Sequence, residues 1–190
     1  MTVGQEREFE QLLDVMKKAA GILNEASVPF ILGGGLACWA RGAPKTEHDI
    51  DFLVKPDDAE RAQQALANAG MRTEQPPEEW LLKAYDDGVL IDLIFAPRGG
   101  PIDDELFTRS EDLEVHAMRL KVAPLEDILV QKLLVLNEQN LDFASVIELA
   151  RSLREQVDWN DVRRRTRASP YAAAYFTLLD RLEIVPASES

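Results

Sequence analysis

The residues best placed to do chemistry are three aspartates in two apolar segments. Asp49 and Asp51 flank Ile50 at the start of the first segment, which continues to Val54. In a β-strand, residues two apart point the same way, so these two carboxylates should project together. About 4 Å apart, they would repel each other by roughly 4 kcal/mol at an effective dielectric constant of about 20. A divalent cation between them would remove that repulsion, and Mg²⁺ takes carboxylate oxygens as ligands.

The third aspartate, Asp92, interrupts the apolar run from Val89 to Phe95. A buried carboxylate is costly unless it is paired or bound to a metal. Its position in mid-strand therefore favours a role at the same cation site. The alternative interpretation is that all three aspartates are solvated residues at strand ends, since an Asp-x-Asp pair alone is common.

A glycine turn, Gly33, Gly34 and Gly35, follows the short apolar segment Phe30-Ile31-Leu32. Glycines let the backbone approach a phosphate closely, and a helix that begins there directs unpaired N–H groups at the anion. A plain strand-to-helix turn is the alternative. Together, the turn, the Asp-x-Asp pair and Asp92 indicate a magnesium–nucleotide site.

A mixture of strands and helices must position these residues. Apolar residues at helical spacing predict a first helix from Glu6 to Ala26. Asp87-Gly88, between two apolar runs, predicts a tight hairpin. Further helices are predicted at 57–69 and 102–107, and strands at 30–32, 50–54, 71–74, 80–85, 89–95, 113–115 and 118–122.

After Pro124 the pattern becomes entirely helical. We therefore expect an α+β fold in which a mixed sheet flanked by helices is followed by a C-terminal helical bundle. The expected division is a core of residues 1–122 and a helical region, 123–190, packed on it. The helices of that region are predicted at 125–136, 141–153, 158–167 and 170–184.

The composition excludes several classes of protein. The net charge of −13, from 34 acidic and 21 basic residues, opposes a general nucleic-acid binder but allows a local basic patch. One cysteine and two histidines cannot form an intrachain disulfide or a dedicated zinc cage. Because no stretch is long enough to span a bilayer and no signal peptide is evident, we expect a cytoplasmic protein with no membrane contact.

Lys132 lies on the same helical face as Ile128 and Leu129. A lysine on an apolar stripe either extends to solvent or meets an anion, and both interpretations stay open. His48 precedes Asp49, and we expect it to shape the loop rather than to touch a substrate.

One basic concentration is present late in the chain. It could bind an RNA backbone through phosphate contacts, or it could be a solvated helix face in an acidic protein, which is the interpretation we favour. Its members are Arg151, Arg154, Arg163, Arg164, Arg165 and Arg167.

These motifs resemble the nucleotidyltransferase superfamily that shares the palm of DNA polymerase β. Its signature is a Gly-Gly or Gly-Ser turn after a strand, an Asp-x-Asp pair and a third acid on a later strand. Here these elements are Gly33 to Gly35, Asp49 with Asp51, and Asp92. Many members carry serine after the first glycine, where this chain has Gly34 or Gly35, so phosphate binding would rest on backbone N–H groups alone.

The resemblance implies a fold, a reaction and a role for each residue. The fold is the polymerase β-like mixed sheet. Asp49, Asp51 and Asp92 would be catalytic and would hold two Mg²⁺ ions, while Gly33, Gly34, Gly35 and Lys132 would bind a nucleoside triphosphate. An acceptor hydroxyl would attack the α-phosphate, and pyrophosphate would leave.

The resemblance leaves the acceptor open. A toxin-type enzyme of toxin–antitoxin or abortive-infection systems, modifying tRNA and controlled by an antitoxin protein, is the first interpretation. A small-molecule enzyme of the aminoglycoside- or lincosamide-modifying type is the second, and it suits the acidity because aminoglycosides are cations. A non-catalytic nucleotide-binding protein is the third.

Overall fold

The structure is a computed structural model that describes residues 3–46 and 49–185. Within these residues the strands form one seven-stranded sheet with the order β3-β4-β5-β2-β1-β7-β6. The neighbours β2 and β5 run parallel, as do β1 and β7, and the other pairs are antiparallel. The strands are β1 (Ile31–Leu32), β2 (Asp49–Leu53), β3 (Arg72–Glu74), β4 (Leu81–Asp86), β5 (Val89–Ile94), β6 (Glu111–Val115) and β7 (Met118–Val122).

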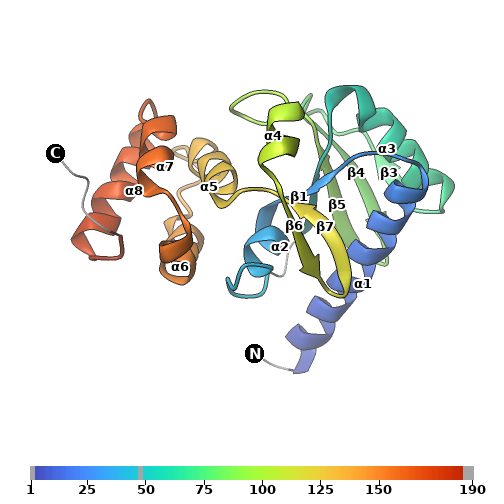
Figure 1. Ribbon diagram of the computed structural model, residues 1–190, viewed down its shortest axis with the longest axis horizontal. Coiled ribbons are helices and arrows are strands. Elements are labelled where there is room, and N and C mark those ends of the chain that lie inside the picture. The colour runs from blue at the N-terminus through green and yellow to red at the C-terminus, as the bar shows by residue number, and fades with distance from the viewer. Residues whose placement is uncertain (1–2, 47–48, 186–190) are drawn as a thin grey trace.

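Helices cover the sheet and continue beyond it. Figure 1 shows the sheet with α1–α4 at one end of the molecule and α5–α8 gathered at the other. The helices are α1 (Val3–Glu25), α2 (Gly34–Trp39), α3 (Pro56–Asn68), α4 (Asp104–Arg109), α5 (Leu125–Leu134), α6 (Phe143–Leu153), α7 (Trp159–Thr166) and α8 (Pro170–Arg181), with the short 3-10 helix η1 (Arg154–Gln156) between α6 and α7.

Local sequence explains where many of these elements begin and turn. The side chains of Asp103, Asp158 and Ser169 accept hydrogen bonds from backbone N–H groups at the starts of α4, α7 and α8. Asp87 and Gly88 both have positive φ, as the two-residue turn between β4 and β5 requires. The predicted α+β fold is confirmed.

Two buried clusters hold the chain together. The larger lies between the sheet and α1, α2 and α3, and the smaller lies among α5–α8. Leu149 and Val157 pack against both clusters, so they lie where the two meet. The division at residues 122 and 123 stays a prediction. None of the helices in the described part of the chain is long and apolar enough to cross a membrane.

Candidate active site

The three aspartates come from two neighbouring strands in the middle of the sheet. Asp51 on β2 lies directly opposite Asp92 on β5, and Asp49 shares its face of β2. One carboxylate oxygen from each residue lies within 4.8 Å of the other two. Asp92 is buried, at 7% exposure, while Asp49 and Asp51 are partly exposed. The convergence that the sequence predicted is therefore present.

Burial and mutual repulsion make this cluster electrostatically unfavourable on its own. Burial, Asp49 and Asp92 raise the pKa of Asp51 to about 7, against an opposing effect of nearby Lys132. Burial also raises the pKa of Asp92, and the attraction of Lys83 offsets this only partly. Cations stabilise such a cluster, and a set of carboxylate oxygens is the donor type that hard divalent ions take.

Lys83 supplies one of those cations and was not predicted from the sequence. It lies opposite Asp92 across β4 and β5, with its Nζ 3.3 Å from Asp92 Oδ1. That oxygen is buried and makes no hydrogen bond with the described residues. Partial burial lowers the pKa of Lys83, but its attraction to Asp92 and smaller effects of Tyr85 and Glu78 together outweigh this and the net shift is upward, so the side chain is an ammonium group.

The glycine turn lies directly against Asp51. The Gly33 N–H donates to the backbone oxygen of Asp51 at 2.8 Å. At Gly34, which has φ +55°, a Cβ would lie only 1.6 Å from Asp51 Oδ2. A Cβ at Gly35 would lie 2.6 Å from Thr46 Oγ1. Gly34 is therefore needed to leave room for the Asp51 carboxylate, and Gly35 to leave room for Thr46, which are reasons that the sequence alone did not supply.

We expect Gly34→Ala to reduce turnover at least about a hundredfold, because the new Cβ would displace Asp51 and lose several kcal/mol of transition-state stabilisation. Gly70→Ala is the matched control, since Gly70 also has a positive φ, +91°, but has nothing within 4 Å of a Cβ. The control should cost about 1–2 kcal/mol of stability and retain turnover. Equal turnover in the two variants, in assays of folded protein, would contradict this role for Gly34.

A cleft of about 870 Å³ opens beside Gly34 and Asp51, while Asp49 and Asp92 do not line it. Its walls come from both halves of the chain, and they include Gly34 and Asp51, Trp80 and Arg98, and Ile128 and Lys132 of α5. Lys132 lies close enough to Asp51 to lower the pKa of the Asp51 carboxyl group. The predicted nucleotide-binding residues Gly34 and Lys132 thus line one cleft with a carboxylate of the triad. His48 lies outside the described residues.

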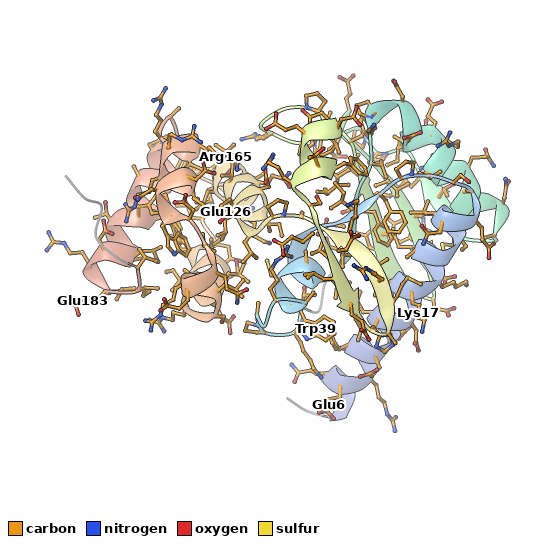
Figure 2. All side chains as sticks on the ribbon, viewed as in Figure 1. Glu6, Lys17, Trp39, Glu126, Arg165 and Glu183 are labelled. Atoms are coloured by element: carbon orange, nitrogen blue, oxygen red, sulfur yellow. The ribbon has the colours of Figure 1, made fainter. Side chains whose placement is uncertain are left out.

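Four of the six late arginines form ion pairs within the chain, Arg154 with Glu155 among them, whereas Arg151 and Arg167 are exposed. Arg163 pairs with Asp180 at 2.5 Å, and Arg164 pairs with Asp161. Arg165 reaches buried Asp127 at 2.7 Å. Figure 2 shows Arg165 on the side of the helical half that faces the sheet. These three side chains therefore bind carboxylates of their own chain rather than forming a free basic face.

Several solved structures with similar folds are described as nucleotidyltransferases or putative nucleotidyltransferases. A crystal structure of ANT(2″)-Ia in complex with adenylyl-2″-tobramycin has a TM-score of 0.65 at 13% identity and covers 86% of this chain and 98% of its own. A putative nucleotidyltransferase from Thermotoga maritima has a TM-score of 0.54 at 20% identity and covers 77% of this chain and 92% of its own. One from H. pylori has a TM-score of 0.50 at 17% identity and covers 95% of this chain and 81% of its own. The fold is therefore that of the nucleotidyltransferases.

The sequence places the chain within that class. Residues 8–183 match the family described as "Uncharacterised nucleotidyltransferase", and the chain belongs to this family. No curated protein sequence matches the chain significantly. The predicted superfamily and the predicted enzyme class are confirmed.

Proposed function

We propose that the chain transfers a nucleoside monophosphate from a nucleoside triphosphate to an acceptor hydroxyl, with Asp49, Asp51 and Asp92 as the catalytic carboxylates. Nucleotidyltransferases use a nucleoside triphosphate and a divalent metal ion. The observation that carries the proposal is the convergence of the three carboxylates within 4.8 Å. They lie beside a glycine turn that a side chain would obstruct.

Each residue has a specific part in the proposed reaction. Asp49 and Asp51 would hold the ions, which we propose are two Mg²⁺, and Asp92 would complete the ligand set. Bound Mg²⁺ would neutralise charge on the triphosphate and stabilise the attacking and leaving oxygens. Asp92, directly or through a bound ion, would take the proton of the acceptor hydroxyl. The hydroxyl oxygen bonds to the α-phosphorus, the bond to the β-phosphate oxygen breaks, and pyrophosphate leaves.

The glycine turn and Lys132 would bind the triphosphate. Gly33, Gly34 and Gly35 let the backbone come close to the phosphates, while Lys132 faces the cleft from α5. Lys132 thereby couples the helical half of the chain to the nucleotide.

We expect Lys132→Ala to weaken binding of a non-hydrolysable nucleoside triphosphate by about tenfold, the loss of one charge-assisted phosphate contact of about 1.5 kcal/mol. Isothermal titration in the presence of Mg²⁺ measures this affinity. Lys17→Ala is the control, because Lys17 is exposed on α1 (Figure 2) and should leave the affinity unchanged. Wild-type affinity in Lys132→Ala would assign Lys132 to solvent instead.

For the acceptor, we place a small molecule ahead of tRNA, which the sequence ranked first. The group of six late arginines suggested tRNA, but Arg163, Arg164 and Arg165 at its centre form intrachain ion pairs. A net charge of −13 also opposes a polyanionic acceptor and suits a cationic one. ANT(2″)-Ia, whose fold is similar, was crystallised with a nucleotidylated aminoglycoside. An antitoxin partner belongs with the tRNA alternative.

Labelled nucleotide transfer tests the proposal directly. Each of the four α-³²P-labelled nucleoside triphosphates is incubated with the protein and Mg²⁺, together with either total tRNA or a panel of aminoglycosides and lincosamides. We expect label on a small molecule and none on tRNA. Label on tRNA would reverse the order of the acceptors. Absence of transfer in every combination would contradict the proposed reaction with these acceptors.

A further inference from the structure

The ion pair between Lys83 and Asp92 lies inside the proposed metal site rather than at the surface. The two residues are directly paired across β4 and β5, so the sheet itself fixes their separation. Their side chains are only 22% and 10% exposed. Asp92 Oδ1, the atom that Lys83 approaches, is buried and accepts no hydrogen bond from any other described residue. The ammonium group of Lys83 is therefore the cation in direct contact with the Asp92 carboxylate.

A second cross-strand pair in the same sheet provides a reference. Lys121 on β7 lies directly opposite Asp112 on β6, with 3.8 Å between Nζ and Oδ2. The lysine is 40% exposed and the aspartate 49%, so water screens both charges. The pairs share residue types and strand geometry, and they differ in burial and in the presence of the other carboxylates. That difference isolates the effect of placing a lysine in the cluster.

The charges that face Asp92 come from several elements. Asp49 and Asp51 on β2 and Glu78 before β4 are negative, while Lys83 on β4 is positive. Lys132 on α5 also acts on Asp51. A divalent ion entering the triad therefore meets a cation that is already in contact with its innermost ligand.

We propose that Lys83 is a resident counter-ion of Asp92 that competes with the divalent ion for this carboxylate, so that the enzyme without nucleotide binds metal weakly. The inference rests on the proposed function, since it assumes that Asp92 is a metal ligand. When a nucleoside triphosphate is bound, its phosphate oxygens supply additional negative ligands and offset the charge of Lys83. Metal and nucleotide then bind cooperatively, and each raises the affinity for the other.

Titration with Mn²⁺ alone, followed by the loss of the free-ion electron paramagnetic resonance signal, tests the inference without any turnover. We expect Lys83→Met to bind Mn²⁺ at least about tenfold more tightly than the wild type, because a full positive charge next to a ligand is removed. Lys83→Arg retains the charge and should stay within about twofold of the wild type, as should the matched control Lys121→Met. Asp92→Asn in the Lys83→Met background should eliminate the gain.

The outcomes separate the inference from the proposed function. Equal or weaker Mn²⁺ binding in Lys83→Met would overturn the inference, as would an equal gain in Lys121→Met. Lys83→Gln is titrated in parallel, so that a folding defect of Lys83→Met, visible by circular dichroism, does not decide the result. If the wild type bound no Mn²⁺ even with a non-hydrolysable nucleotide present, the metal site of the proposed function would fail instead.

Discussion

Asp51→Asn is expected to abolish nucleotidyl transfer, lowering turnover at least about a thousandfold while the fold persists. Asp51 lies at the centre of the proposed site, because it is opposite Asp92 on β5, lies against Gly34 and lines the cleft. Loss of a metal-ligating carboxylate removes several kcal/mol of transition-state stabilisation, and each 1.36 kcal/mol is a factor of about ten in rate. Transfer of label from an α-³²P nucleotide measures the loss, and near-wild-type turnover would refute the assigned role.

The same variant should be more stable than the wild type when metal is absent. Burial, Asp49 and Asp92 raise the pKa of Asp51 to about 7, above its ordinary value near 4. Asp51 therefore binds its proton more tightly in the folded state than in the unfolded state, so its ionisation lowers the stability of the fold as the pH rises from about 4 to about 7. Above about pH 7 the ionised Asp51 destabilises the fold to its full extent, and there Asp51→Asn should raise the melting temperature by a few degrees. Asp112→Asn, at a solvated site, should not.

Asp127→Ala is expected to lower the free energy of unfolding by about 2–4 kcal/mol, because it leaves two arginines without their shared carboxylate. Asp127 on α5 is buried, at 6% exposure. It accepts hydrogen bonds from Arg109 at 2.5 and 3.2 Å and from Arg165 at 2.7 Å. This network of Arg109, Asp127 and Arg165 connects α4, beside the sheet, to α7 of the helical half. The side chains of Arg109 and Arg165 are 42% and 27% exposed, so water can solvate their charges in part once Asp127 is removed. The expected loss of stability is therefore at the lower end of the range for breaking a buried ion pair.

Urea unfolding measures this effect, with Asp112→Ala as the control. Asp112 has one partly exposed lysine partner, Lys121, and its removal should cost less than about 1 kcal/mol. Because α5 also carries Lys132, Asp127→Ala should weaken nucleotide binding in protein that remains folded. If both variants unfolded at the same urea concentration, the ion pairs of Asp127 with Arg109 and Arg165 would have no special role in joining the two halves.

Much of the fold and of the candidate site could be predicted because the decisive signals are local. Period-two spacing placed Asp49 and Asp51 on one face of β2, and an aspartate in an apolar run indicated Asp92. A helix was predicted from residue 158, and the side chain of Asp158 caps α7 there by accepting hydrogen bonds from backbone groups only two and three residues away. Such features depend on a few neighbouring residues, so a single sequence contains them.

Lys83 was within reach of the sequence but was missed. The predicted Asp87-Gly88 turn has two residues, which places Asp86 opposite Val89 and therefore Lys83 opposite Asp92. Following the register along the hairpin would have identified a lysine beside the third carboxylate.

Other features depend on contacts between distant segments. Asp127 lies 18 residues from Arg109 and 38 from Arg165, and no local pattern reveals their meeting. For the same reason, a run of arginines does not show which of them are already paired. The adjacency of β1 and β7 likewise follows only from the folded chain.

The central claim is that Asp49, Asp51 and Asp92 share divalent ions beneath a bound triphosphate. A crystal structure with Mn²⁺ and a non-hydrolysable nucleoside triphosphate, with anomalous data collected at the manganese edge, tests it most directly. We predict anomalous peaks within about 2.3 Å of oxygens from all three carboxylates, with the triphosphate against the turn at Gly33 to Gly35. Ions bound elsewhere, or a nucleotide held away from Asp92, would contradict it.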